Sequence, residues 1–206
     1  SFSDTQNITH NLAEVFGKDF LVQQIKNPGK QLDPNILANK MAKLAIAQAP
    51  SDIKPFTRSD ITITHDTSKA AIEHYLKTFD NIFLSAFSVL TKKNNAVIAF
   101  KESLEQKNTA RLDDINPTIH AYDLFLAGLK TIPVPEDFIA LHLSYLTTTV
   151  KEQTAMKKLL SAHTDIVFAT VGLREILETT KEFERLRKQY QDLYTSKGII
   201  AQTTNQ

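Results

Sequence analysis

The stretch from Thr67 to Thr91 reads TSKAAIEHYLKTFDNIFLSAFSVLT. Its large apolar residues recur at steps of three and four, which places them on one side of an α-helix: Ile72, Tyr75, Leu76, Phe79, Ile82, Phe83, Phe87 and Leu90. The spacing predicts an amphipathic helix over about 67–91. Because the apolar side of such a helix must pack against another element, the stretch indicates a helical bundle.

The next residues leave one boundary open. The polar run Lys92-Lys93-Asn94-Asn95 separates this helix from a further apolar set, Val97, Phe100 and Leu104. Such a run can end a helix or lie on its exposed side. The sequence is therefore compatible with one helix or two over 67–108.

Three more helices are predicted toward the C-terminus. Asn116-Pro117 is a cap followed by a proline, a typical helix start, and Pro133 ends that segment. A second helix is predicted from about residue 136 to 162. Apolar residues cover more than half of its surface, so we expect it to lie centrally in the bundle.

The last long helix is predicted over 166–196, with Asp165 as its N-cap. Its apolar seam steps by threes and fours, with the polar Thr180 in register: Ile166, Ala169, Leu173, Ile176, Phe183 and Tyr190. Ser196-Lys197-Gly198 ends the helix. Gly172 lies inside it, and we expect close contact with another helix to explain a glycine there.

The N-terminal region predicts a helical hairpin. Apolar residues share one side of a helix over about 5–25: Ile8, Leu12, Val15, Phe16 and Val22. Asp33-Pro34 starts a second helix through about residue 49. Pro50 and Pro55 bracket a linker, and the alternation from Ile61 to Thr64 favours at most a short extended segment.

Together these segments predict an all-α fold, a multi-helix bundle with an N-terminal helical hairpin. The expected parts are the hairpin at 1–50, a linker at 51–66, the main bundle at 67–196 and a tail at 197–206. Only five glycines occur in 206 residues, which suits helices joined by short loops.

Composition excludes several functional classes. The formal net charge is +1, so no overall field attracts nucleic acid, and we expect no such partner. The chain has no cysteine, which removes thiolate metal sites and thiol nucleophiles. No run approaches the roughly 18 apolar residues of a membrane-spanning helix.

Several short stretches resemble an uncharacterised family of membrane-anchored proteins from candidate-phyla-radiation bacteria such as Parcubacteria. They are 56–61 (FTRSDI), 66–70 (DTSKA), 129–135 (LKTIPVP), 141–143 (LHL) and 169–173 (ATVGL). In similar proteins an N-terminal transmembrane segment precedes a domain outside the cytoplasmic membrane. The resemblance implies the same location here, and a start at Ser1 rather than Met would fit removal of an upstream segment. It implies no activity.

No catalytic or metal-binding residues are predicted. Six histidines are present, but none are paired at the three- or four-residue spacing of two metal ligands on one helix. Phosphate loops, dinucleotide fingerprints and the Gly-x-Ser-x-Gly nucleophile motif are missing. His142 lies among apolar residues, and we interpret it as a core histidine hydrogen-bonded to a carbonyl or a tyrosine hydroxyl.

Two functions remain open from the sequence. The favoured one is a non-enzymatic structural or interaction domain with a protein partner in the cell envelope. Association with further copies of the same chain, as a homo-oligomer, is also compatible with the sequence. Such a domain would need no cofactor and would meet the membrane only through a tether. The alternative is a sensory bundle that binds a small molecule between helices through His142, Tyr145 and Tyr122.

Overall fold

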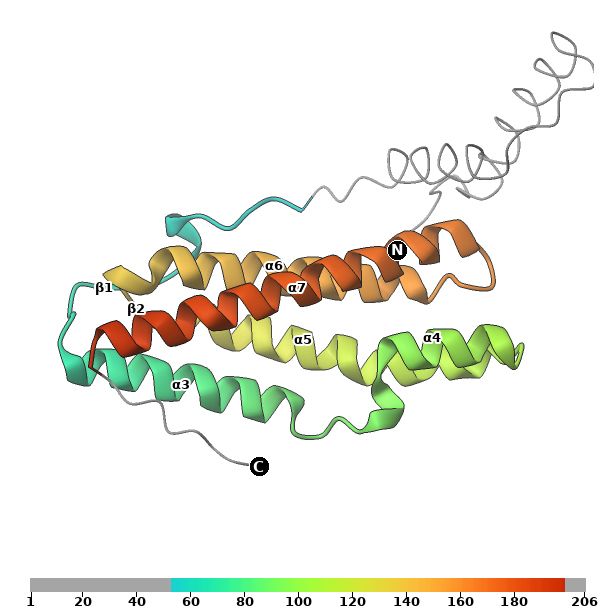
Figure 1. Ribbon diagram of the computed structural model, residues 1–206, viewed down its shortest axis with the longest axis horizontal. Coiled ribbons are helices and arrows are strands. Elements are labelled where there is room, and N and C mark those ends of the chain that lie inside the picture. Colours follow the sequence, from blue (N-terminus) through green and yellow to red (C-terminus); the bar gives the residue numbers. More distant parts are fainter. Residues whose placement is uncertain (1–52, 199–206) are drawn as a thin grey trace, which may run out of the picture.

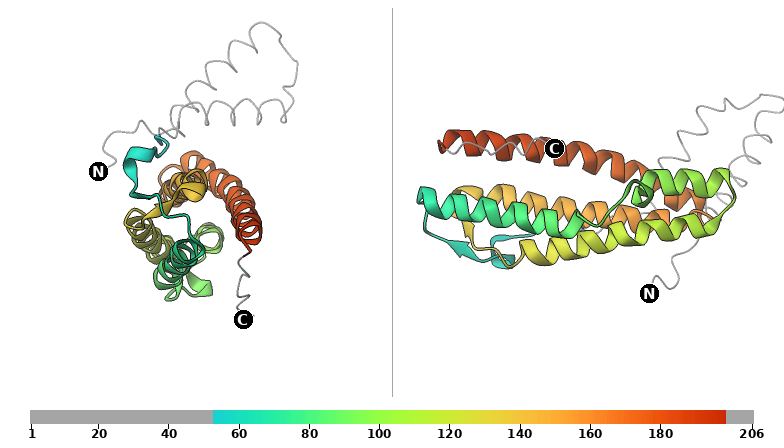
Figure 2. Two further views of the ribbon diagram at one scale, coloured as in Figure 1. Left: turned by 90° about the vertical axis from the view of Figure 1, so that its left-hand side faces the viewer. Right: turned by 90° about the horizontal axis from the view of Figure 1, so that it is seen from below.

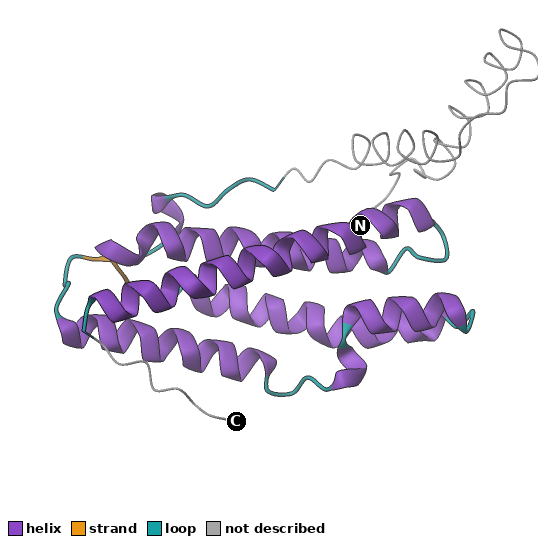
Figure 3. Ribbon diagram, in the orientation of Figure 1, coloured by secondary structure: helices purple, strands orange, loops and turns teal. Residues whose placement is uncertain are grey.

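Helices form most of the part of the protein that the structure describes. A computed structural model describes residues 53–198, and five α-helices lie in this range (Figures 1 and 3). They are α3 (Lys69–Phe87), α4 (Ala96–Glu105), α5 (Asn116–Leu129), α6 (Ile139–Leu159) and α7 (Ile166–Ser196). The predicted all-α bundle is confirmed. The predicted hairpin at 1–50 lies outside the described residues.

The segment before α3, predicted as a linker, packs on the bundle in its described part, residues 53–66. Its partly buried apolar residues Phe56, Ile61 and Ile63 contact the hydrophobic core. It contains a 3-10 turn, η1 (Arg58–Asp60), and a two-residue strand, β1 (Ile63–Thr64). β1 pairs in parallel with β2 (Val134–Pro135), Ile63 opposite Val134. The extended segment at 61–64 was predicted, but its partner was not.

Residues 67–108 form two helices. α3 ends at Phe87, and the polar run folds into the 3-10 turn η2 (Lys92–Asn94). Asn95 then caps α4, because its Oδ1 accepts hydrogen bonds from the backbone N–H groups of Val97 (3.1 Å) and Ile98 (3.0 Å). The Asn94 amide donates to the carbonyl of Asp114 at 3.2 Å, which ties the turn to the residues just before α5.

Two predicted helix caps have different outcomes. Asp165 caps α7 as expected, since its carboxylate accepts from the N–H of Phe168 at 3.0 Å. The cap predicted at Asn116 is wrong by one position: Ile115 is the N-cap, and Asn116 already belongs to α5. The reason is a further 3-10 helix, η3 (Thr109–Ile115), which runs straight into α5, so that the N–H of Asn116 donates to the carbonyl of Asp113.

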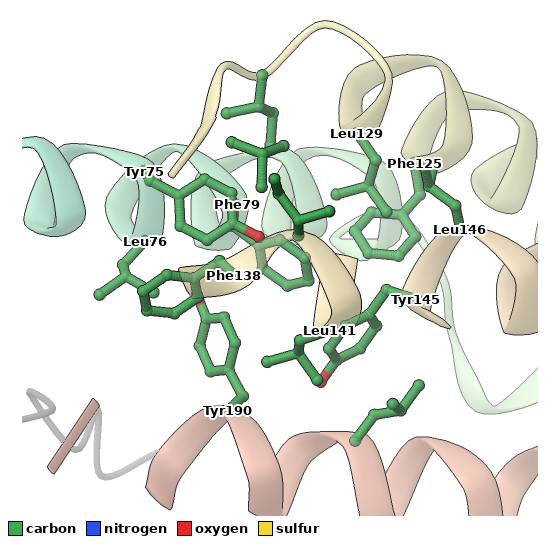
Figure 4. Packing of buried hydrophobic residues seen from close by; sticks show 14 of the residues in the cluster. Tyr75, Leu76, Phe79, Phe125, Leu129, Phe138, Leu141, Tyr145, Leu146 and Tyr190 are labelled. Carbon is green, nitrogen blue, oxygen red and sulfur yellow. The ribbon is translucent and has the colours of Figure 1, made fainter. Parts of the chain in front are cut away.

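The helix α6, preceded by the 3-10 turn η4 (Glu136–Phe138), lies between α5 and α7, as its apolar surface predicted. It joins two separate hydrophobic clusters. The aromatic cluster at one end is shown in Figure 4 and includes Tyr75, Phe79, Phe125, Phe138, Tyr145 and Tyr190. The second cluster is built around Ala99, Ile115, Ala155, Leu159, Ala169 and Ile176.

The long helix α7 packs mainly along α6. In both views of Figure 2 its ribbon stands apart from α3, and side chains such as Tyr190, whose ring is 5.2 Å from that of Phe79, bridge the space. Two lines of α7 residues spaced by seven are mostly buried: Ala169, Ile176, Phe183 and Tyr190, and beside them Gly172, Thr179 and Leu186. The predicted seam therefore holds in part: Leu173 is half-buried against the second cluster, whereas Ile166 and Thr180 are exposed.

Candidate functional site

His142 of α6 is buried, and both of its ring nitrogens are hydrogen-bonded. The Nε2 atom lies 3.1 Å from the carbonyl oxygen of Leu129, which can only accept, so Nε2–H donates. The Nδ1 atom is then the acceptor for the hydroxyl of Tyr75 at 3.0 Å. The prediction of a core histidine bonded to a carbonyl or a tyrosine hydroxyl is confirmed, and the structure shows both bonds.

This environment favours the neutral imidazole. Burial lowers the pKa of His142 from 6.5 to about 4, against the opposing hydrogen bond to Leu129. A histidine with a lowered folded-state pKa stabilises the protein fully above about pH 6.5, and this contribution is lost as the pH falls toward 4. His142 therefore makes the fold acid-sensitive.

The other two predicted residues lie elsewhere in the core. Tyr145 packs against Phe79 with ring centroids 5.1 Å apart, and Tyr122 of α5 packs against Phe87 at 5.0 Å. Both rings also face Phe183 of α7, at 6.2 and 6.5 Å. The structure thus brings Tyr122 and Tyr145 to one aromatic residue, whereas His142 bonds to Tyr75.

The sequence analysis missed a buried acidic residue on α6. Glu152 is only 5% exposed, and Thr179 of α7 donates a hydrogen bond to its carboxylate. Burial raises the pKa of Glu152 from 4.5 to about 7, with Thr179 opposing the shift. The side chain therefore changes its charge near neutral pH inside the α6–α7 interface.

Further buried polar side chains lie next to Glu152, on the side of α6 that faces α5. The amide of Gln153 donates to the carbonyl of Ile119 at 3.3 Å and to the carboxylate of Asp123, while its oxygen accepts from Lys157 at 3.1 Å. The polar residues lie between the two hydrophobic clusters. One signal could have located Glu152: it stands seven residues after Tyr145 and seven before Leu159, in line with two buried residues.

A buried ion pair lies further along the same interface. Lys158 of α6 is 4% exposed, and its ammonium is 2.6 Å from the carboxylate of Glu175 on α7 and 5.6 Å from the ring centre of Phe168. Breaking the pair would leave an uncompensated buried charge, which favours the arrangement of α7 on α6 that keeps it.

Four aromatic rings form a continuous line from α3 across α5 to α7. We call them the aromatic row: Phe83, Phe87, Tyr122 and Phe183. Successive ring centroids are 4.9, 5.0 and 6.5 Å apart. Phe83 is 47% exposed and the other three are half-buried, so the row is only partly covered. Aromatic side chains left accessible in this way are typical of protein interfaces.

Within residues 53–198 no group of three or more potential metal ligands comes together. In the same range no helix is long and apolar enough to cross a membrane.

These features describe an all-α bundle domain with two separate hydrophobic clusters and a partly covered aromatic row. No protein-family model matches the chain, and no curated protein or solved structure does so either.

The buried tyrosines allow a matched test of the His142 hydrogen bonds. Tyr75→Phe is expected to lower the free energy of unfolding by about 1–2 kcal/mol, because Nδ1 of His142 loses its donor in the core. Tyr190→Phe is the control, since the Tyr190 hydroxyl is buried without a hydrogen-bond partner among the described residues. Urea unfolding of both variants measures the difference. Equal losses would contradict the assignment.

Proposed function

We propose that the chain is a non-enzymatic structural or interaction domain that presents a helical surface to a protein partner. The aromatic row carries the proposal. Phe83 keeps 47% of its surface exposed beside three half-buried rings, and the adjacent Leu84 is 60% exposed. Binding energy at protein interfaces is concentrated in a few such aromatic anchors.

The charge and the buried polar groups agree with this function. A net charge of +1 gives no electrostatic preference for nucleic acid. The alternative, a sensory bundle that binds a small molecule through His142, Tyr145 and Tyr122, has less support. Both ring nitrogens of His142 already bond inside the core, so none is left for a ligand.

We further propose that the domain lies outside the cytoplasmic membrane, held by a tether, in an envelope assembly such as a pilus or a secretion apparatus. The support is the resemblance of 56–61, 129–135 and 169–173 to membrane-anchored bacterial proteins. Protease treatment of intact and lysed cells tests the location. We expect the protease to degrade the domain once the layers outside the cytoplasmic membrane are removed, while that membrane is still intact. Protection of the domain until the cells are lysed would contradict the proposed location.

Site-specific photo-crosslinking tests the partner surface. A photoreactive phenylalanine analogue replaces Phe83 in the full chain, in cells of the organism that makes it. The control carries the analogue at Ala127, an exposed position of α5. We expect a discrete covalent adduct with another protein from position 83 and none from position 127. Adducts of equal yield from both positions, or none from position 83, would contradict the proposal.

A further inference from the structure

The contacts between α6 and α7 change in kind along their interface. Near the start of α7, Gly172 packs on the backbone of α6, where an added Cβ atom would lie 2.6 Å from a carbonyl oxygen. One turn further, Glu175 pairs with Lys158 at 2.6 Å, and Thr179 then donates to the carboxylate of Glu152. The first part of α7 is thus held by close backbone packing and by a buried ion pair.

The part of α7 after Thr179 is held mainly by side chains. The ring of Phe183 lies 6.5 Å from that of Tyr122 and 6.2 Å from that of Tyr145. The ribbon of α7 stands apart from α3 in Figure 2. Glu152 therefore lies at the boundary between the closely packed part of α7 and the part that carries one ring of the aromatic row.

An ionised Glu152 has no cationic partner within residues 53–198. Its carboxylate accepts a single hydrogen bond there, from Thr179. Burial and, to a smaller extent, the charge of Glu152 raise the pKa of Tyr122, which places this phenol near the carboxylate. The charged and titratable groups on the adjoining turns and on the helices packed against α6 are Lys151, Lys157 and Lys158 of α6, Glu175, Glu178, Lys181 and Glu182 of α7, His120, Tyr122 and Asp123 of α5, and Lys101, Glu102 and Glu105 of α4.

The cations in this set act on other groups or are exposed. Lys157 bonds to Gln153, Lys158 pairs with Glu175, and Lys101 pairs with Glu105. Lys151 lowers the pKa of Glu182, and Lys181 and His120 are exposed. Because no cation compensates the carboxylate of Glu152, its charged form is stabilised by water, which it reaches when the two helices separate.

We propose that loss of the proton from Glu152 opens the part of α7 after Thr179, and that this opening uncovers two rings of the aromatic row, Tyr122 and Phe183, for the partner. The row is then more accessible above neutral pH than in acid. The inference rests on the proposed function only in treating the row as the partner surface.

The direction and size of the effect follow from proton binding. Burial raises the pKa of Glu152 from 4.5 to about 7 in the closed interface, and a hydrated carboxyl in the open one keeps the ordinary value. The opening constant therefore rises as the pH increases from 4.5 to 7 and levels off above. The rise is roughly 300-fold in total, of which about 70-fold falls between pH 5 and 8. Leu186 and Tyr190 are buried and oppose the opening, so the open form is a minor population without a partner.

Hydrogen exchange of backbone amides detects such a minor form. Opening constants are obtained for residues 180–190 between pH 5 and 8, after division by the intrinsic exchange rate at each pH. We expect them to exceed those of residues 72–79 of α3 throughout and to rise by about 70-fold over this range. Glu152→Gln is expected to remove most of the rise, and Glu178→Gln, which changes an exposed residue of α7, to preserve it.

Three outcomes would overturn the inference. Equal opening constants for α7 and α3 at each pH would show that Glu152 reaches water only when the whole domain unfolds. Larger constants for residues 180–190 that do not change with pH would indicate ordinary fraying of the helix end. A rise that persists in Glu152→Gln would show that another group controls the opening. The measurement needs no partner, so its failure leaves the proposed function intact, which the crosslink at Phe83 tests independently.

Discussion

Replacing Glu152 by glutamine is expected to raise the free energy of unfolding at pH 8 by about 2–3 kcal/mol and to leave it nearly unchanged at pH 4.5. The folded-state pKa of Glu152 is raised from 4.5 to about 7 by burial between α6 and α7. A carboxyl group with a raised pKa stabilises the fold fully below pH 4.5, and the contribution is lost as the pH rises through 7. Glutamine stays neutral and can still accept from Thr179.

Urea unfolding between pH 4.5 and 8 measures this effect. Glu178→Gln is the control, since Glu178 is an exposed residue of α7. His142 acts in the opposite direction, because its lowered pKa destabilises the fold on the acid side. The two buried groups partly cancel in the wild-type pH profile, so the variant must be compared with wild type at each pH. An equal gain at pH 4.5 and 8 would show that the carboxyl is not buried as described.

Gly172→Ala is expected to lower the free energy of unfolding by about 1–3 kcal/mol, although alanine is the better helix former. A Cβ atom at position 172 would lie 2.6 Å from the carbonyl oxygen of Ala155 and 2.7 Å from Cβ of Lys158. Both atoms belong to or adjoin the α6 backbone, which cannot move without separating the two helices. The cost of overpacking therefore exceeds the gain in helix propensity.

Gly128→Ala is the matched control. The three heavy atoms nearest to a Cβ atom there are all side-chain atoms of Ile82, which can shift without separating two helix backbones. We expect a smaller loss, within about 1 kcal/mol of wild type, because propensity offsets part of the strain. Urea midpoints compare the two variants. A midpoint of Gly172→Ala at or above wild type would mean that α6 and α7 do not cross closely at this glycine.

The helices were predictable because their signals are local. The steps of three and four from Ile72 to Phe87 are sufficient to predict α3, and Asp165 marks the start of α7 by a side chain that bonds within its own turn. The end of α3 was not predictable, since the turn at 92–95 is tied to the carbonyl of Asp114, twenty residues away. The pairing of Ile63 with Val134 is likewise a tertiary contact.

The same distinction applies to the candidate site. His142 was identified because a polar residue among apolar neighbours stands out in the sequence. Glu152 stood among other polar residues, and only the packing of Thr179 against it makes it a buried group. The aromatic row combines side chains from three helices, so it arises only from tertiary packing.

The affinity of the crosslinked partner for purified variants of the full chain tests the central claim most directly, namely that the aromatic row is the binding surface. Leu84→Asp places a charge beside Phe83, whereas Ile98→Asp makes the same change on an exposed position of α4. We predict that Leu84→Asp raises the Kd at least about tenfold, or 1.4 kcal/mol, and that Ile98→Asp leaves it unchanged. Equal Kd values for wild type and Leu84→Asp would contradict the account.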